Sequence, residues 1–465
     1  MTLLLGAISL DVTPPPGHPL DGYAARAATA LGTADPLRAT MIWLSTEDDP
    51  GVLWLSLDAV AAGTELTAEL AAAASTATGI PADRVLVCAS HTHSGPTGWS
   101  GAIHPVIPGE REPALYKPLI AAVESASLPR RPVIAAWHST EVTGVGTNRY
   151  HPDGPHDNTA GALALRQYDG TLAAVLLDFA CHPTAYGPEN LLWSADYPGA
   201  ARTAISAAPV VGFLQGAAGD VSPRFTRQGR DAAEIRRLGG ILAAGVLDAL
   251  ATEGHAVPSE APQIRRTTIR LPVRDLPPAD EIAATVTAAQ HAVAGNSASA
   301  RDSASARDSA SARDSGSARD SGSAGDSDAA RGSGGAGDSG GARDSGRARG
   351  EAPAARIAQT RLDGARGQAA MRDAALPEAY DLPVSVVTLG DIAWIHLPVE
   401  PFAAHGLHLQ AASPYPITRV IGYTDGYFGY LVDPEAHQTG TYEALISFFD
   451  PTATHTLLTQ TRTLL

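Results

Sequence analysis

The sequence predicts an α/β fold, in which one large domain contains a mixed or parallel sheet flanked by helices. Strand-like and helix-like runs alternate along the chain. The strand-like runs are continuous stretches of Val, Leu and Ile, a pattern typical of strands buried on both faces. A chain of 465 residues allows two or three domains at roughly 150 residues each, or one large α/β unit.

The elements alternate in a regular order. The run at 51–61 (GVLWLSLDAVA) predicts a strand, 64–79 a helix and 83–90 (DRVLVCAS) a second strand. Further along, 172–181 (LAAVLLDFAC) and 210–216 (VVGFLQG) predict strands, 233–251 predicts a helix, and 385–400 (SVVTLGDIAWIHLPVE) predicts the last strands. The first strand is expected within MTLLLGAISLDV, which has no basic region and too short an apolar stretch for a signal peptide.

Composition excludes several classes of function. The formal net charge of −16 argues against unaided binding to nucleic acid or anionic lipid, which both require Lys and Arg to neutralise phosphates. Lys117 is the sole lysine and GK[ST] is absent, which disfavours Schiff-base chemistry and excludes a P-loop. Two cysteines cannot form a disulfide scaffold. No apolar run is long enough to span a membrane, so we expect a cytoplasmic protein without a transmembrane segment.

One segment differs from the rest in composition. Residues 296–350 are almost entirely Ser, Ala, Gly, Arg and Asp, and offer no apolar face to a core, so we expect a disordered low-complexity insertion. The flanking stretches 279–295 and 353–376 are helix-like. The insertion is therefore expected at the tip of a helical hairpin within one domain spanning 1–465, rather than between two domains, because loop-closure cost grows only slowly with length.

Polar residues follow three of the predicted strands. His91 and His93 come directly after VLVCAS, His182 follows LAAVLLDFAC, and Glu400 follows IAWIH. Each alone is more often structural, and chance supplies roughly half of an H-x-H per chain of this composition. Together, two or three histidines and a carboxylate at strand ends are the ligand set of a catalytic zinc site.

Two further clusters carry polar side chains. Residues 216–223 (GAAGDVSP) follow a strand, and Asp220 and Ser222 could act as base, nucleophile or substrate-orienting groups, or could cap the next helix. Residues 422–444 contain four tyrosines, 423, 427, 430 and 442, which could donate to an oxyanion, bind zinc or pack in the core. His405 and His408 have helical ligand spacing without a matching carboxylate, and we leave them out of the site.

These clusters, in this order, resemble the neutral/alkaline non-lysosomal ceramidase family. The matching motifs are DVTPPPGHPLDGYA, HTHSGPTG, the Asn148-Arg149 pair in GVGTNRY, FACHPT, SADYPG, FLQGAAGDVSP, LPVE, and GYTDGYFGY with TYEA after it. They extend from about residue 6 to 444. The chain departs from the family pattern at Arg224, where Asn usually follows GDVSP. Because the sequence continues for only about twenty residues after TYEA, we expect it to be without the family's C-terminal β-sandwich domain.

The resemblance implies a site and an activity. Zinc ligands would be His91, His182, Glu400 and Tyr430. His93, Arg149 and Tyr442 would surround the substrate carbonyl, and Ser222, with Asp220 nearby, would orient the substrate. The implied reaction is hydrolysis of a linear N-acyl amide by zinc-activated water, with Zn2+ as cofactor. The implied partner is a small-molecule amide, with a sphingolipid such as ceramide as one candidate and a smaller or more polar amide as another.

Two alternatives remain open from the residues. One is a serine hydrolase with Ser222 as nucleophile and His93 as base, which the absence of a G-x-S-x-G elbow disfavours. The other is a zinc-stabilised or small-molecule-binding protein without turnover, because a fold does not secure a function. Among these hypotheses, the motifs that the chain shares with the ceramidase family favour an amidohydrolase of the ceramidase type.

Overall fold

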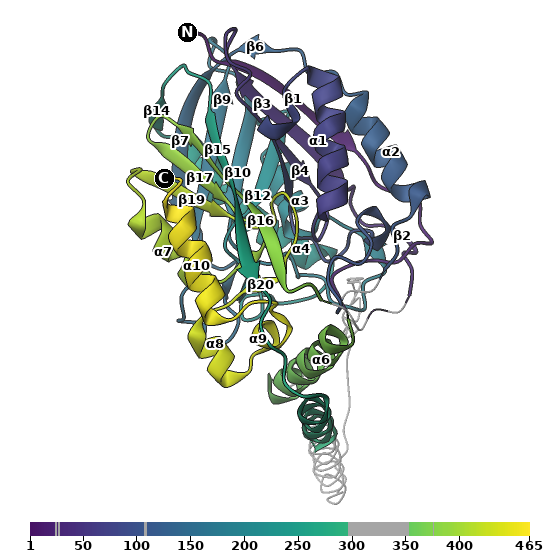
Figure 1. Ribbon diagram of the computed structural model, residues 1–465. Coiled ribbons are helices and arrows are strands. Elements are labelled where there is room, and N and C mark those ends of the chain that lie inside the picture. The colour runs from purple at the N-terminus through teal and green to yellow at the C-terminus, as the bar shows by residue number, and fades with distance from the viewer. Residues whose placement is uncertain (24–25, 27, 107–108, 296–352, 375) are drawn as a thin grey trace, which may run out of the picture. The chain divides into compact units, whose positions relative to one another are not determined.

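The computed structural model describes residues 1–465 except 24–25, 27, 107–108, 296–352 and 375 (Figure 1). The chain forms two compact units, Met1–Pro277 with Arg366–Leu465, and Pro278–Ala365. In the second unit, residues 279–295 are helical and α6 (Pro353–Asp373) begins, so the helices predicted on both sides of the insertion are present. Residues 296–350, for which we predicted disorder, lie entirely outside the described residues. The first unit contains every candidate site residue.

The described part of the first unit contains three larger sheets, not one. The first has the order β5-β4-β3-β1-β6, with β5 (Val85–Ala89), β4 (Val52–Leu57), β3 (Arg38–Ser45), β1 (Leu4–Asp11) and β6 (Arg131–Pro132). The second has the order β12-β10-β9-β7-β14, with β12 (Val211–Gln215), β10 (Leu172–Phe179), β9 (Thr159–Arg166), β7 (Ile134–Glu141) and β14 (His255–Val257). The third has the order β15-β16-β17-β19, with β15 (Gln263–Pro272), β16 (Ala379–Leu389), β17 (Ile392–His396) and β19 (Ile417–Ile421).

Short strand pairs lie in the connections around these sheets. They are β2 (Gly32–Thr33) with β11 (Leu192–Trp193), β8 (Thr147–Asn148) with β13 (Val221–Ser222), and β18 (Glu400–Pro401) with β20 (Tyr430–Leu431). Isolated bridges join larger sheets at one end: Cys88 pairs with Thr424, and Gly216 pairs with Ile421. The three sheets are therefore linked where β5, β12 and β19 end.

Helices cover the outer face of each sheet. Helices α1 (Thr64–Thr78) and α2 (Pro113–Glu124) share a core with the first sheet and lie on one side of β1, β3 and β4 in Figure 1. Helices α3 (Asp196–Ala204) and α4 (Ala232–Leu250) share a core with the second. The third packs with α7 (Ala403–Ala412), α8 (Pro434–Thr439), α9 (Tyr442–Ile446) and α10 (Pro451–Arg462). Short 3₁₀ turns occur at η1 (Ala82–Arg84) and η2 (Thr97–Trp99).

A further core joins the inner faces of the three sheets. It contains Trp54 of β4, Trp137 of β7 and Trp394 of β17, one tryptophan from each sheet. The ring of Trp394 lies 5.8 Å from each of the other two, edge to face. Such aromatic pairs add to the apolar area that each ring buries.

This arrangement corrects the single sheet that we predicted. Most neighbouring strands are antiparallel, and each larger sheet has one parallel pair: β4 with β5, β10 with β12, and β17 with β19. The apolar runs are buried on both faces because a helix layer covers one face and another sheet covers the other. A continuous apolar run in the sequence indicates only that both faces of the strand are buried, and not whether a helix or a sheet covers them. The mixed α/β class and the flanking helices are confirmed. Within the described residues, no helix is long and apolar enough to cross a membrane.

The three-tryptophan contact predicts a large effect on stability. Replacing Trp394 with Ala leaves a cavity between all three sheets and should lower the free energy of unfolding by about 3 to 5 kcal/mol. Urea denaturation followed by circular dichroism measures it. The control is Tyr168→Ala, at an aromatic that is 69% exposed, which should change stability by less than about 0.5 kcal/mol. Equal effects of the two substitutions would contradict the central role of Trp394.

Candidate metal centre

The candidate site lies where the parallel strands end. β5 leads into His91 and His93, β10 into His182, and β17 into Glu400. The sequence prediction that these residues lie at strand ends therefore agrees with the structure. Ligands collect at such edges of α/β sheets, because several connections leave the strands there and bring their side chains together.

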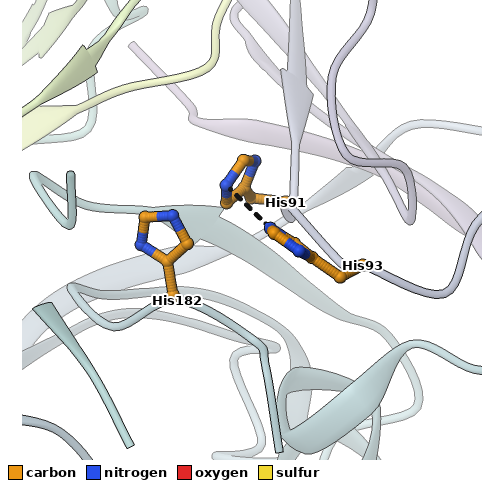
Figure 2. A group of neighbouring side chains, drawn as sticks. All are labelled: His91, His93 and His182. Carbon is orange, nitrogen blue, oxygen red and sulfur yellow. Dashed lines mark hydrogen bonds between the residues drawn. The ribbon is translucent and has the colours of Figure 1, made fainter. Parts of the chain in front are cut away.

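The three histidines form a group that could hold a metal ion. One nitrogen from each of His91, His93 and His182 lies within 4.8 Å of the other two. Nε2 of His93 is 3.3 Å from Nε2 of His91, and the rings of His91 and His182 have centroids 4.5 Å apart. Figure 2 shows the three rings close together, with His91 and His93 on one segment and His182 on another. His91 and His182 are each 1% exposed, and His93 is partly buried.

Glu400 completes the group. Its Oε2 lies 3.3 Å from Nε2 of His91 and 3.1 Å from Nε2 of His182. Burial alone would raise the pKa of the Glu400 carboxyl, but the two imidazoles hold it well below its usual range. The hydroxyl of Tyr423 donates to Oε2 at 3.3 Å, and that of Tyr427 donates to Oε1. The carboxylate is therefore ionised and fixed in orientation.

A backbone carbonyl orients the ring of His91. Its Nδ1 is 2.7 Å from the carbonyl oxygen of Val60, which can only accept a hydrogen bond, so Nδ1 carries the proton and Nε2 has a free lone pair. The backbone of His91 is left-handed, with φ of 66°. Left-handed non-glycine residues are uncommon and concentrate at functional sites. This turn aims the ring at Glu400 rather than along the strand.

The ring of His182 has two competing neighbours. Its Nδ1 is 2.6 Å from the carbonyl oxygen of Ala218 and 2.8 Å from Nη2 of Arg149. The carbonyl requires a proton on Nδ1, whereas Arg149 would need a lone pair there, so one tautomer satisfies only one of them. We take the carbonyl bond, because it is shorter and leaves the Nε2 lone pair directed at the cluster. Nε2 of His182 lies 3.1 Å from Oε2 of Glu400, but the angles between them are not those of a hydrogen bond.

Burial favours the neutral form of two of these imidazoles, those of His182 and His93. It lowers the pKa of His182 to about 3, with help from the positive charge of Arg149. It also lowers the pKa of His93 well below its usual range. Neutral imidazoles and an ionised carboxylate are the protonation states in which these side chains bind metals. The residues present therefore fit a zinc ion, although the chemistry of the donors does not by itself identify the metal.

Tyr430, the fourth ligand implied by the resemblance, lies beside this group. Its ring stacks on that of His182 with centroids 6.5 Å apart, and its backbone pairs with Glu400 between β18 and β20. Burial and the Glu400 charge raise the pKa of its phenol well above the usual value. A phenolate ligand there would need the charge of a metal. Tyr430 as a ligand remains a prediction.

A second charged group adjoins the histidines. Arg149 is buried, and its Nη1 forms an ion pair of 2.8 Å with Oε1 of the fully buried Glu443. The hydroxyl of Tyr150 donates to the other oxygen of Glu443. Tyr442, which we predicted near the substrate carbonyl, is partly buried and lies 6.2 Å from the ring of Tyr430. Sequence reasoning missed Glu443 as a partner of Arg149, although it lies in the TYEA motif.

Asp220 and Ser222 lie in the segment after β12. Both oxygens of Asp220 are engaged: Oδ1 accepts from the backbone N–H of Ala403, and Oδ2 accepts from the side chain of Asn148, both at 2.7 Å. Burial raises the pKa of Asp220 to about 6. Ser222 is buried in β13, where it pairs with Thr147 of β8. Within the described residues, no hydrogen bond joins Ser222 to His93.

The sequence indicated the positions of His93, Tyr423 and Tyr427 less clearly. His93 was expected beside the substrate carbonyl, and the structure brings it within ligand distance of His91 and His182. Tyr423 and Tyr427 were noted only as members of a tyrosine-rich stretch, and they are the two that contact Glu400. Which tyrosine faces the carboxylate depends on the turn, since Tyr423 has a left-handed backbone with φ of 54°.

The fold and the site define a mixed α/β protein with helix-covered sheets and a buried histidine and carboxylate cluster that could hold a metal ion. No family model matches the sequence, and no curated protein matches it. The chain is similar to the solved neutral ceramidase from Pseudomonas aeruginosa, with 15% identity, a TM-score of 0.70, and coverage of 99% of this chain and 73% of that one. It is also similar to a ceramidase complexed with C2, at 14% identity, a TM-score of 0.68, and coverage of 99% and 74%. The chain therefore has the neutral ceramidase fold, as the motifs predicted.

The contact of Gly22 with His93 predicts a local effect on the cluster. Gly22 has φ of 92°, and a Cβ there would lie 2.5 Å from Cγ of His93, so Gly22→Ala must displace that ring. Metal affinity should fall roughly tenfold or more, as for other changes that misplace ligands. Competition with a fluorescent chelator measures it. The matched control is Gly17→Ala, where φ is 101° and a Cβ would meet nothing within 4 Å. If both variants lose metal affinity equally, backbone strain and not the contact with His93 causes the loss.

The neutral buried histidines predict acid sensitivity of the metal-free protein. Burial lowers the pKa of His182 and of His396 to about 3, and that of His104 to about 4. The unfolded chain binds these protons near pH 6.5 and the folded chain does not, so stability falls as pH drops below about 6.5. Each histidine should cost about 2 kcal/mol at pH 5.

Urea titrations at pH 7.5 and pH 5 measure this loss. The variant His396→Gln should reduce the pH dependence. The control Leu31→Ala, at a side chain that does not titrate and is 73% exposed, should leave it unchanged. A stability that does not change over this range would show that these rings are not buried in the neutral form.

Proposed function

We propose that this chain is a zinc-dependent hydrolase of linear N-acyl amides. One observation carries the proposal: three histidines and a buried carboxylate converge beside a buried arginine, in a chain with the neutral ceramidase fold. We propose one catalytic domain spanning 1–465, located in the cytoplasm. Its substrate class includes lipid amides, with ceramide as one candidate.

We propose that the metal is held by Nε2 of His91, Nε2 of His182, Glu400 and Tyr430. Two contacts prepare the imidazoles for this role, because the carbonyls of Val60 and Ala218 hold the proton on Nδ1. A zinc ion bound there lowers the pKa of water and polarises an amide carbonyl. His93 is either a third imidazole ligand or a donor to the substrate, and these roles differ in their effect on metal affinity.

Hydrolysis adds water across the amide bond. The water oxygen bonds to the acyl carbon, the C–N bond breaks, and a proton passes to the leaving nitrogen, which yields a carboxylate and an amine. We propose that Tyr442 donates its hydroxyl proton in a hydrogen bond to the carbonyl oxygen as that oxygen gains charge. The guanidinium of Arg149, fixed by Glu443, adds a permanent positive charge beside that position.

Ser222 and Asp220 are assigned to positioning. Asp220 lies on the same segment as Ser222. Its carboxylate accepts hydrogen bonds from Asn148 and from the start of α7, so it fixes this segment against both of those elements. Its occupied oxygens argue against a role as general base. Ser222 would orient the substrate through its hydroxyl. A nucleophilic role is less favoured, because no described histidine forms a hydrogen bond with it.

Metal removal tests the proposal directly. Purified protein should contain about one zinc per chain, lose amide hydrolysis on treatment with a chelator, and regain it with zinc alone. Metal content is measured by mass spectrometry of the elements, and hydrolysis by release of amine from a library of N-acyl amides. Hydrolysis that persists in metal-free protein would contradict zinc dependence.

Three variants separate the assigned roles. His182→Ala should lose zinc and activity, whereas Ser222→Ala should retain zinc while kcat falls by roughly two orders of magnitude, as for loss of a transition-state hydrogen bond. His93→Ala should lower zinc affinity if His93 is a ligand, and lower kcat alone if it is a donor. An acyl group trapped on Ser222 would instead establish the serine hydrolase.

A further inference from the structure

Three arginines flank the candidate metal centre. They are Arg26, Arg224 and Arg227, and we call them the flanking arginines. Each donates to the backbone of a segment that carries a predicted site residue. Within the described residues, none of the three lies within 4 Å of a carboxylate oxygen, whereas Arg149 pairs with Glu443.

Their contacts place them around the cluster. Nη1 of Arg26 donates to the carbonyl oxygen of His93 at 2.8 Å. Nη1 of Arg227 donates at 2.9 Å to the carbonyl oxygen of Thr184, two residues after His182. Nη1 of Arg224, two residues after Ser222, donates at 3.1 Å to the carbonyl oxygen of Arg149.

Neutral carbonyls leave this positive charge uncompensated. All three side chains are only partly exposed, and Nη2 of Arg227 is buried without a partner among the described residues. Buried charges are normally paired, and an unsatisfied buried donor is costly. Burial and the neighbouring Arg230 and Arg224 lower the pKa of Arg227, which reflects repulsion between guanidiniums. All three nevertheless remain protonated at neutral pH.

The nearby acids do not balance this charge. Glu189 pairs with Arg230 at 3.4 Å, on the exposed side of the group. Burial raises the pKa of Asp21 to about 6, so this carboxyl is still mostly ionised at neutral pH and offsets the charge of Arg26, but not the charges of Arg224 and Arg227. Glu443 acts electrostatically on Arg224, but its two oxygens bond to Arg149 and Tyr150. The guanidiniums are thus in excess beside the site.

We propose that the flanking arginines select an N-acyl amide carrying an anionic group, a carboxylate or a phosphate. This substrate class deepens the proposed amide hydrolysis and rests on it. The anion would occupy the free N–H groups of Arg227 and Arg224, which present planar forks suited to such oxygens. A neutral amide would leave the charges of Arg224 and Arg227 without a counter-charge.

A matched substrate set tests this selectivity. N-dodecanoylglycine carries a carboxylate on the amine half, and N-dodecanoylethanolamine is its neutral counterpart. The ethanolamine monoamide of dodecanedioic acid carries the carboxylate on the acyl half instead. At least one anionic amide should exceed the neutral amide in kcat/KM by about tenfold or more, the effect of one charge-assisted hydrogen bond. The preferred member shows which half carries the anion.

Arginine variants link the preference to these residues. Arg227→Gln and Arg224→Gln should each reduce the ratio of kcat/KM for the anionic over the neutral amide by about tenfold. The matched control, Arg270→Gln, removes the same charge from β15, where Arg270 is exposed and pairs with Asp381, and should keep the ratio. A ratio near one in the unmodified protein, or one unaffected by both arginine variants, would overturn the inference.

Binding separates this inference from the proposed function. Isothermal titration calorimetry on the full chain measures the affinity for the same amides whether or not they are hydrolysed. If no amide is hydrolysed but the anionic one binds at least tenfold tighter and Arg227→Gln abolishes the difference, amide hydrolysis fails and anion selection stands. If all three amides are hydrolysed and bound equally, hydrolysis stands and anion selection fails.

Discussion

Glu400 is an ionised carboxylate that is only 1% exposed, and the removal of such a charge from water must be compensated locally. The hydroxyls of Tyr423 and Tyr427 donate to this carboxylate. The Nε2 lone pairs of His91 and His182 face the same carboxylate, so a cation held between them would complete the compensation. His91 follows a strand of the first sheet and His182 a strand of the second, whereas Glu400 and the tyrosines follow strands of the third. The charge can therefore be buried only if the three sheets meet at one edge.

Hydrogen bonds to backbone carbonyls explain how the imidazole rings are oriented around this charge. Backbone carbonyls of Val60 and Ala218 accept from Nδ1 of His91 and His182, which sets the tautomers without adding another charge. Outer contacts of this kind orient metal ligands and tune their basicity. Arg149 introduces a positive charge beside His182, and Glu443 neutralises it at 2.8 Å. Arg149 and Glu443 therefore form an adjacent pair of opposite charges beside His182.

The sequence predicted the parts of the site that depend on where strands end. His91, His182 and Glu400 follow apolar runs, and a run that stops at a polar residue marks the edge of a sheet. It could not predict three sheets, since an apolar run is the same whether a helix or another sheet covers its second face. Nor could it show that Tyr423 and Tyr427 contact Glu400, because left-handed turns set the direction of these rings. Glu443 was missed because its partner, Arg149, lies almost three hundred residues away in the chain.

The geometry of the site also helps to explain how charge is distributed over the chain. The chain has a formal net charge of −16, and its basic residues are almost all arginine. A lysine that loses its hydration readily loses its proton, whereas a guanidinium stays charged when partly buried and is less strongly hydrated. Arginines such as Arg224 and Arg227 can therefore keep positive charge beside the metal centre while the protein as a whole is acidic. An overall negative field slows the approach of any anionic substrate, so selection of such a substrate has to depend on short-range contacts within the site rather than on long-range attraction.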